Sequence, residues 1–276
     1  MNHRNLAGKV VLITGAAGGL GAALCRRYAA AGAKIAALDL DAQRLDALVA
    51  TLRAAGAEAL AVPGDITDPA ACKAAVAATL AHFGALDGLI NNAGISHRSL
   101  LADTDPDVIR RVMEVNFFGA ANLTHAALPH ITARRGFIVA ISSVAGFSPL
   151  TGRTGYAASK HALHGFFDSL RSEVEGAGVG VTLVCPSFIR TGIGAAATDG
   201  SGAPVSSPRI TTGGESSPEE IAQRIFDAVA AGHKLLLPDA TARKAWLLSR
   251  LVPGLYARIM KRRVGGEFED PKSGSQ

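Results

Sequence analysis

The sequence predicts an α/β protein in which a doubly wound parallel sheet of about seven strands carries helices on both faces. Short apolar runs alternate with longer alanine-rich segments, without an internal repeat of fixed period. The predicted strands are residues 10–13, 35–38, 57–62, 88–90, 137–141, 179–184 and 234–237. The predicted helices lie near residues 19–31, 41–55, 69–82, 105–130, 155–176 and 218–231. Strands and helices that alternate in this way form right-handed βαβ units, whose ligands bind beyond the carboxyl ends of the strands.

Two of the predicted helices carry their own start signals. Asp68 precedes Pro69, and Ser217 precedes Pro218 with two glutamates in the first turn. Asp and Ser side chains accept hydrogen bonds from the free N–H groups of a first helical turn, and proline fits its first position. These signals predict helix starts at residues 69 and 218.

Composition limits the class of protein. With 276 residues, of which 48% are apolar and 18% charged, the chain can bury a sizeable core, which excludes disorder as its main state. No apolar run approaches the ~20 residues that a transmembrane helix needs, and the first residues lack the pattern of a secretory signal. We therefore expect a cytoplasmic protein. The odd count of three cysteines, without a Cys-x-x-Cys pair, predicts reduced thiols and no metal site.

Two segments interrupt the alternation of strands and helices. Residues 187–217, rich in Gly, Ser, Thr and Pro, are predicted to form a mobile substrate loop over the site. The catalytic domain then spans residues 1–239, and residues 240–276 form a basic amphipathic helical extension interrupted at Pro253-Gly254. Residues 233–263 hold eight basic side chains and one acidic, so the net charge of +5 is a property of this end of the chain.

The basic extension admits three interpretations. Its helices can pack on the domain or on a second subunit with their basic face in solvent. Residues 240–263 can instead contact an anionic membrane peripherally, since Trp and Leu opposite Arg and Lys is the composition of interfacial helices. Binding of nucleic acid is the least favoured interpretation, because few aromatic residues lie among the charged ones. We expect no nucleic-acid partner.

A glycine-rich turn follows the first predicted strand and opens the first helix, in the sequence Thr14-Gly15-Ala16-Ala17-Gly18-Gly19-Leu20-Gly21. Gly15 permits the tight turn, Gly19 lets the backbone approach a pyrophosphate, and Gly21 lets helix and strand pack closely. The strand before and the helix after are the context that a dinucleotide-binding motif requires. This predicts a Rossmann-like cofactor site that includes Ala17 and Leu20, although a glycine turn can also serve packing alone.

The second predicted strand ends at Asp39, 18 residues after Gly21. A carboxylate at this place accepts both ribose hydroxyls of an adenosine and repels a 2′-phosphate. No basic residue lies within residues 16–20, and the first after Asp39 is Arg44. NAD is therefore the predicted cofactor, with NADP less favoured; a merely solvated Asp39 would leave the choice open.

Tyr156 and Lys160 lie four residues apart in a predicted helix, which puts the phenol and the ammonium on one face. A free tyrosine has a pKa near ~10, but an adjacent ammonium and an oxidised nicotinamide both favour the phenolate. Tyr156 could then exchange a proton with a substrate oxygen. The same spacing occurs by chance in many helices, so its weight depends on the neighbouring motifs.

At this point the sequence resembles the short-chain dehydrogenase/reductase family. The motifs occur in the family's order: Thr14-Gly-x-x-x-Gly-x-Gly21, Asp65 in Gly64-Asp65-Ile66, Asn91-Asn92-Ala93-Gly94, Asn116 in Val115-Asn116-Phe117, Ile141-Ser142-Ser143 and Tyr156-x-x-x-Lys160. The resemblance covers about residues 8–237. It implies hydride transfer between a nicotinamide cofactor and a substrate carbon, in an enzyme that is a homodimer or homotetramer.

The resemblance also implies roles for single residues. Ser143 matches the serine that hydrogen-bonds the reacting oxygen, and Lys160 the lysine that holds the ribose hydroxyls and lowers the tyrosine pKa. Asn116 matches an asparagine that interrupts its helix to hold a water of the proton relay. The matched cofactor contacts are Asp65 and Ile66 at the adenine, and Asn92, Ala93 and Gly94 behind the cofactor.

The sequence departs from the family after the sixth predicted strand, where Pro186 is followed by Ser187 in place of the usual glycine. Thr191 still matches a hydroxyl that binds the nicotinamide carboxamide, and Ile189 a backbone contact to the same group. The serine narrows the backbone freedom beside the ring, which affects the shape of the site more than cofactor binding.

We expect an NAD(H)-dependent oxidoreductase that interconverts a secondary alcohol and a ketone, with Tyr156 as general acid/base and no metal. Apolar walls are predicted at Phe147, Leu150, Phe188 and Ile193, so the substrate contacts are Ser143, Tyr156, Phe147 and Phe188. They favour a lipophilic substrate such as a steroid, a retinoid or a long-chain alcohol. The alternatives are an NADPH-dependent 3-ketoacyl-type reductase and, from another class, a non-catalytic dinucleotide-binding or peripheral membrane protein.

Overall fold

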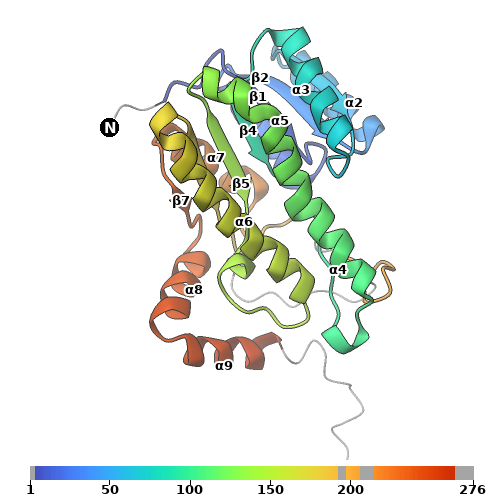
Figure 1. Cartoon of the computed structure of the whole chain (residues 1–276), viewed down its shortest axis with the longest axis vertical. Coiled ribbons are helices and arrows are strands. Elements are labelled where there is room, and N and C mark those ends of the chain that lie inside the picture. Colours follow the sequence, from blue (N-terminus) through green and yellow to red (C-terminus); the bar gives the residue numbers. More distant parts are fainter. Residues whose placement is uncertain (1–3, 192–196, 206–213, 265–276) are drawn as a thin grey trace, which may run out of the picture.

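A single parallel sheet of seven strands runs through the centre of the computed structural model, which describes residues 4–191, 197–205 and 214–264 (Figure 1). The strand order is β3-β2-β1-β4-β5-β6-β7, and every pair of neighbours is parallel. The strands are β1 (Val10–Thr14), β2 (Lys34–Asp39), β3 (Ala59–Pro63), β4 (Gly88–Asn91), β5 (Phe137–Ile141), β6 (Gly180–Val184) and β7 (Leu235–Leu236). The order reverses between β1 and β4, where a doubly wound sheet opens its binding crevice.

Helices cover both faces of the sheet. On one face lie α1 (Gly19–Ala30), α2 (Ala42–Ala54) and α7 (Pro218–Ala230). On the other lie α3 (Pro69–Phe83), α5 (Gly119–Ala133) and α6 (Thr154–Val174). The predicted α/β class and sheet type are thereby confirmed.

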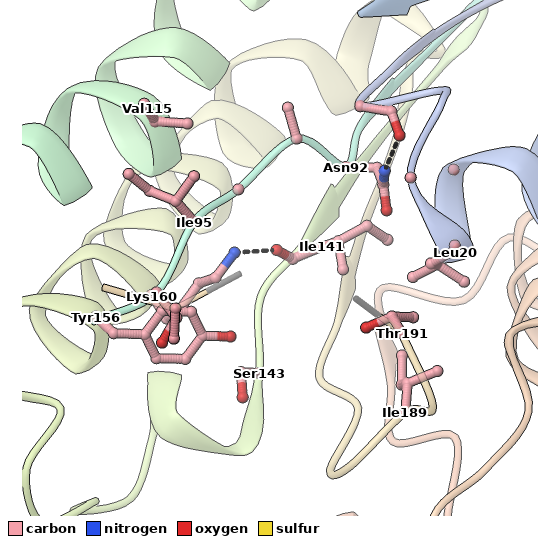
Figure 2. Close-up of a pocket in the computed structure, with 18 of the residues that line it drawn as sticks. Leu20, Asn92, Ile95, Val115, Ile141, Ser143, Tyr156, Lys160, Ile189 and Thr191 are labelled. Carbon is pink, nitrogen blue, oxygen red and sulfur yellow. Dashed lines mark hydrogen bonds between the residues drawn. The ribbon is translucent and has the colours of Figure 1, made fainter. Parts of the chain in front are cut away.

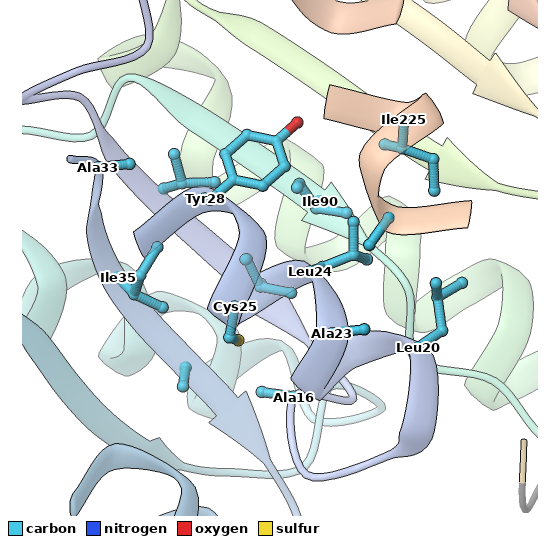
Figure 3. Packing of buried hydrophobic residues seen from close by; sticks show 14 of the residues in the cluster. Ala16, Leu20, Ala23, Leu24, Cys25, Tyr28, Ala33, Ile35, Ile90 and Ile225 are labelled. Atoms are coloured by element: carbon cyan, nitrogen blue, oxygen red, sulfur yellow. The ribbon is translucent and has the colours of Figure 1, made fainter. Parts of the chain in front are cut away.

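Alternating side chains of the strands fill two separate cores, because successive residues of a strand point to opposite faces. In β1, Val11 and Ile13 join the core under α1, and Leu12 joins the opposite one. Figure 3 shows Tyr28 and Leu24 of α1 lying between the sheet and Ile225 of α7. Burial on both faces explains why the strands are apolar runs rather than alternating ones.

Side-chain caps begin the helices where the sequence predicts them. Asp68 accepts a hydrogen bond from the N–H of Ala70 at 2.8 Å, with Pro69 in the first turn of α3. Ser217 accepts one from the N–H of Glu220 at 3.1 Å at the start of α7. Both predicted starts are confirmed; each such cap is worth roughly 1 kcal/mol.

The helix predicted near residues 105–130 is confirmed as one continuous helical stretch, which a π-helical turn interrupts. The chain forms α4 (Pro106–Met113), then a π-helical turn η2 (Glu114–Phe118), and then α5. The turn contains Asn116, which is 1% exposed and bonded to the backbone of Ile95. A local widening of this kind places a side chain where a regular helix would not, and periodicity alone does not reveal it.

Short 3-10 turns complete the connections: η1 (Leu101–Asp103), η3 (Val144–Gly146) and η4 (Glu175–Ala177). The loop predicted over residues 187–217 includes 192–196 and 206–213, which lie outside the described residues together with Ile193. Its described parts form isolated bridges between Ile189 and Ser216 and between His97 and Thr198.

The C-terminal extension forms α8 (Ala240–Leu251) and α9 (Pro253–Val264), with the break at the proline as predicted. The two helices follow β7 (Figure 1), and side chains of Asp239 and Tyr256 bond them to the domain. The carboxylate of Asp239 caps α8 by accepting the N–H of Ala242 at 2.7 Å, and it also accepts the N–H of Ser187 at 3.0 Å. The Tyr256 hydroxyl, in a side chain only 5% exposed, donates to Ser148 at 3.4 Å.

Three further findings concern sequence-based expectations. No helix in the described ranges is long and apolar enough to cross a membrane. Cys25, Cys72 and Cys185 are buried free thiols. Across residues 4–191, 197–205 and 214–264, no three His, Cys, Asp or Glu side chains are grouped as a metal site would require.

Candidate active site

A cleft of about 520 Å³ lies beyond the carboxyl ends of the strands, at the reversal of strand order between β1 and β4 (Figure 2). The structure brings most of the predicted site residues into its wall: Gly15, Gly19, Leu20, Gly21, Asp39, Asp65, Ile66, Asn92, Ala93, Gly94, Ser143, Tyr156, Lys160, Pro186, Phe188, Ile189 and Thr191. Ala17, Asn116 and Phe147 lie outside this lining set. Residues that follow six different strands therefore meet in one place, as expected for a doubly wound sheet.

The glycine turn forms a cradle that side chains would fill. Gly15 has a φ of +62°, and a Cβ there would come within 2.9 Å of the Ala93 Cα. A Cβ on Gly19 would come within 3.2 Å of the Thr191 Cγ2, and one on Gly21 would overlap the carbonyl oxygen of Gly15. The turn ends at the N-terminus of α1, where free N–H groups favour an anion. The cradle fits a pyrophosphate.

Asp39 marks the end of the cleft that would hold the adenosine ribose. One carboxylate oxygen accepts the N–H of Ala17 at 2.9 Å, and the other accepts the N–H of Asp41 at 3.1 Å. Ala17 thus contributes by orienting Asp39. The Arg44 guanidinium donates to the Ala17 carbonyl at 2.8 Å and also lines the cleft. Arg44 is a site residue that sequence reasoning missed, because it lies a helical turn beyond the motif.

The predicted adenine contacts lie at the end of β3. The backbone N–H of Thr67 donates to Asp65 at 2.9 Å and its hydroxyl at 2.8 Å, and these bonds hold the pKa of the Asp65 carboxyl below its usual value. Ile66 is 7% exposed, and its side chain occupies the space beside Gly119. Arg111 of α4 lines the same end of the cleft. It too was missed, since nothing in the sequence places α4 beside the cleft.

The Asn92-Ala93-Gly94 segment is held against the end of β1. The Thr14 hydroxyl accepts the N–H groups of both Asn92 and Ala93, each at 2.9 Å. The Asn92 amide in turn donates to the Thr14 carbonyl at 2.8 Å and to the Gly15 carbonyl at 3.2 Å. This segment is therefore fixed to the glycine turn and forms the back wall of the cleft.

Tyr156 and Lys160 project from the first turns of α6 into the cleft, facing Ser143 at the end of β5 (Figure 2). The ammonium lies 5.6 Å from the centroid of the Tyr156 ring and donates to the Ile141 carbonyl at 2.8 Å. Lys160 is only 3% exposed, and burial lowers its pKa to about 8. The Ser143 hydroxyl accepts the N–H of Ala145 at 3.2 Å, which leaves its proton directed elsewhere.

Asn116 lies behind this group and bonds to two segments of it. Its side-chain oxygen accepts the N–H of Ile95 at 2.8 Å, while its amide donates to the Ile95 carbonyl and to Ser159, each at 2.9 Å. Ser159 precedes Lys160 and donates to the Tyr156 carbonyl at 2.8 Å. The geometry supports a positioning role for Asn116, which connects the segment after β4 with the helix that carries the tyrosine and lysine.

The opposite wall is formed by residues 186–191. The N–H of Thr191 donates to the Ile189 carbonyl at 2.8 Å, and its side chain contacts the turn at Gly19. The buried Ser187 hydroxyl has no hydrogen-bond partner within the described part of the chain. Such an orphaned polar atom in a cleft wall fits a ligand that supplies the missing bond.

Phe147 does not reach the cleft. Its ring faces the His164 imidazole edge to face, with centroids 6.3 Å apart. Phe147 directly follows η3, and its predicted contact with substrate stays a prediction. Leu150 and Phe188 do line the cleft, together with Arg98 and Arg153, two residues that the sequence motifs do not identify. Their positions depend on long-range folding of the loops that carry them.

The parallel sheet, the glycine cradle and the Tyr-Lys pair facing a serine define an oxidoreductase with a Rossmann-like fold. Residues 9–201 match the family model described as short chain dehydrogenase. The chain is 42% identical to dehydrogenase/reductase SDR family member 7B of Bos taurus over 272 residues, which covers 96% of this chain and 84% of the relative. It is 38% identical to 11-beta-hydroxysteroid dehydrogenase-like 2 of Arabidopsis thaliana over 193 residues, 69% of this chain and 62% of the relative.

A solved structure agrees with these relatives. A short-chain dehydrogenase/reductase from Burkholderia phymatum, in complex with NAD, superposes with a TM-score of 0.82 at 29% identity. The superposition covers 91% of this chain and 96% of that one. The chain belongs to the short-chain dehydrogenase/reductase family.

Proposed function

We propose that the protein is an NAD(H)-dependent oxidoreductase that interconverts a secondary alcohol and a ketone. The observation that carries this proposal is the placement of Tyr156, Lys160 and Ser143 around one point of a cleft whose far end holds Asp39. A bound nicotinamide cofactor would supply the hydride exchange. The protein then has to position the substrate and move one proton.

The side chains divide this work. The Ser143 hydroxyl donates a hydrogen bond to the reacting oxygen, and Tyr156 takes the proton of an alcohol or gives one to a ketone. The Lys160 ammonium favours the phenolate of Tyr156 electrostatically. With its pKa near 8, Lys160 keeps this charge at neutral pH and loses it as the pH rises further. The Ile141 carbonyl fixes its position in the cleft wall.

NAD rather than NADP is the proposed cofactor because Asp39 is oriented by two backbone N–H groups at the ribose end. A 2′-phosphate there would meet this carboxylate. The NAD complex of the Burkholderia phymatum relative supports the choice. Arg44 supports the alternative, an NADPH-dependent 3-ketoacyl-type reductase, because its guanidinium lies beside the same end of the cleft.

We propose that a lipophilic substrate binds at the end of the cleft opposite Asp39. Leu150 and Phe188 line the same cleft as Tyr156, and the name of the Arabidopsis thaliana relative refers to a hydroxysteroid. Arg98 and Arg153 also line the cleft, so one end of the substrate would lie near charged side chains. Steroid-, retinoid- and long-chain-alcohol-like compounds are the first candidates.

Thermal unfolding with each cofactor tests the proposal. NAD at about 100 times its Kd should raise Tm by roughly 5–10 °C, because a ligand that binds only the folded state stabilises it by RT ln(1 + [L]/Kd). The purified protein is then given a panel of secondary alcohols and followed at the NADH absorbance. Stabilisation by NADP alone would favour the reductase. Stabilisation by NAD without turnover of any alcohol or ketone would favour a non-catalytic nucleotide-binding protein.

We propose in addition that α8 and α9 lie on an anionic membrane surface. Half of the exposed large apolar side chains in the described residues belong to this unit: Leu247, Leu248, Leu251, Val252 and Leu255. Basic residues accompany them on the same two helices: Arg243, Lys244, Arg250, Arg258, Lys261 and Arg262. Apolar side chains flanked by cations suit an anionic lipid interface. Asp239 attaches this unit to Ser187 in the cleft wall, so a lipophilic substrate in the membrane would lie close to the cleft.

Vesicle flotation tests the membrane contact. The protein should float with vesicles of phosphatidylserine and phosphatidylcholine, less so at high salt, and the double variant Leu251→Glu/Leu255→Glu should stay at the bottom. Leu40→Glu is the matched control, because Leu40 is 67% exposed on another part of the surface. Equal flotation of both variants would contradict the contact and would favour the alternative that α8 and α9 pack on a second subunit.

A further inference from the structure

His97 lies between the catalytic helix and the described part of the substrate loop, and it has no part in the chemistry described so far. Its side chain is completely buried. The N–H of Gly155 donates to its Nε2 at 2.9 Å, and its Nδ1 lies 3.2 Å from the Ser99 hydroxyl. Gly155 immediately precedes Tyr156 in the first turn of α6. The imidazole therefore touches the backbone that positions the proposed acid/base.

The hydrogen-bond chain specifies which tautomer His97 adopts. The Thr104 hydroxyl donates its one proton to the Leu100 carbonyl at 2.6 Å, so Ser99 donates to Thr104 across 2.7 Å. The Ser99 oxygen is then the acceptor for His97, which must carry its proton on Nδ1. Nε2 is left with a lone pair, and that lone pair accepts the N–H of Gly155. Every donor in the chain thus has an acceptor when the imidazole is neutral.

This bond acts as a helix cap supplied from outside the helix. The N-cap residue of α6, Arg153, makes no side-chain capping bond to the first turn. His97, 58 residues earlier in the chain, satisfies one of the N–H groups that a helix start leaves open. A Cβ on residue 155 would come within 3.1 Å of Nε2, so glycine permits the close approach.

The segment that holds His97 also binds the loop beyond β6. The N–H of Arg98 donates to the Thr198 carbonyl at 2.8 Å, and the N–H of Thr198 donates to the Ser96 carbonyl at 3.1 Å. The N–H of Ser99 donates to the Gly152 carbonyl at 3.1 Å. One short stretch therefore ties the start of α6 to residues 197–205, the part of the substrate loop that faces it.

We propose that His97 is a positioning residue which, as a neutral imidazole, holds the first turn of α6 and thereby aims the Tyr156 hydroxyl. The proposal rests on the proposed function, in which Tyr156 exchanges the proton. An imidazolium would present an N–H to the N–H of Gly155, and two donors cannot bond to each other. Protonation of His97 therefore releases the cap and moves the tyrosine.

The surroundings of His97 keep it neutral at ordinary pH. Burial lowers its pKa below the usual 6.5, and the Arg153 cation lowers it further. The other charged side chains on the segments packed against it are Arg98, Asp103, Asp105 and Asp199. Because the folded-state pKa is lowered, the stabilising effect of the cap is complete above pH 6.5 and is lost as the pH falls through the folded-state value.

Two substitutions separate the cap from mere filling of space. His97→Phe fills the site without an acceptor and should lower kcat by about 10- to 100-fold with little change in KM for NAD, the cost of a misplaced catalytic group. His97→Gln offers a neutral amide oxygen near the position of Nε2 and should retain most of the wild-type kcat. It should also lack the fall in kcat that the wild type shows below pH 6.5, since an amide does not titrate. His161→Gln, in an exposed part of α6, is the matched control and should keep the wild-type pH profile.

The overturning results are specific. The proposal fails if His97→Phe equals the wild type in kcat, or if His97→Gln has the same acid limb as the wild type. A readout independent of turnover is the phenolate absorbance near 295 nm, taken as the difference from Tyr156→Phe, whose midpoint should shift in His97→Phe and not in His97→Gln. If no alcohol or ketone is turned over by the wild type, the proposed function fails. The absorbance titration and the dependence of Tm on pH still decide the role of His97.

Discussion

Tyr156→Phe should lower kcat by a factor of about 10²–10⁴ at neutral pH, the range expected when a positioned general acid/base is removed. The ring and its contact with Lys160 remain, so the KM for NAD should change by less than about threefold. The rate is measured at the NADH absorbance, with the best alcohol found in the panel. Turnover equal to that of the wild type would show that another group moves the proton.

Tyr28→Phe is the control for this substitution because it removes the same hydroxyl from the core. Tyr28 is a fully buried residue of α1, and its hydroxyl has no hydrogen-bond partner among the described residues. Loss of the Tyr28 hydroxyl therefore removes no protein hydrogen bond. The value of kcat should be unchanged, and the free energy of unfolding should be unchanged or slightly raised. A similar loss of activity in both variants would indicate damage to the fold rather than to the chemistry.

Asp39→Ala should lower kcat/KM with NAD by about 10- to 100-fold, since two charge-assisted hydrogen bonds to the ribose would be lost. The same substitution removes the charge that opposes a 2′-phosphate. The ratio of kcat/KM for NADP to that for NAD should therefore rise by about 10²–10³. An unchanged ratio would mean that Asp39 does not select the cofactor.

Arg44 makes this prediction sharper. Its guanidinium bonds to the Ala17 carbonyl next to Asp39, within reach of the same part of the cleft. In Asp39→Ala it becomes the cation nearest the ribose end and should supply the attraction for the phosphate. Adding Arg44→Ala should then abolish most of the gain with NADP while leaving the loss with NAD as it was. A gain of equal size in the double variant would show that the phosphate finds its charge elsewhere.

The sequence determines this fold locally to an unusual extent. Each strand is a short apolar run because helices cover both faces of the sheet, and each helix up to α7 lies between two such runs. The caps at Asp68 and Ser217 depend on residues next to the helices they begin, so local rules find them. The π-helical turn at Asn116 is different, because its cause is a bond to Ile95, 21 residues away.

The residues of the candidate site also fall into two groups, those that local sequence patterns predict and those that only the tertiary structure places there. The glycine turn, Asp39 and the Tyr156-Lys160 pair follow from spacing within one or two elements, and the structure places them together in the cleft. Arg111 comes from α4, which packs against α6, and its presence in the cleft could be expected only from the tertiary arrangement. Phe147 lies against His164 and outside the lining of the cleft, a placement that the spacing after Ser143 does not predict.

Asp39, Asn116 and His97 share one property that sequence patterns do not convey. Each side chain forms a hydrogen bond with backbone that is distant in the sequence. The residue type alone therefore suggests a chemical role, whereas the observed contact holds part of the site in position. His97 in particular could have been taken for a solvated loop residue, because the glycine that it caps lies 58 residues further along the chain.

The two bonds of the Asp239 carboxylate bear on how this enzyme can be recombined with its relatives. One oxygen begins the C-terminal helices and the other holds the backbone of Ser187, so the residue belongs to the extension and to the cleft wall at once. A chimaera joined after residue 239 keeps both bonds if the grafted helix starts with free N–H groups. A junction one residue earlier removes the acceptor of the Ser187 N–H, and the exchange of a peripheral helix then becomes a change in the catalytic cleft.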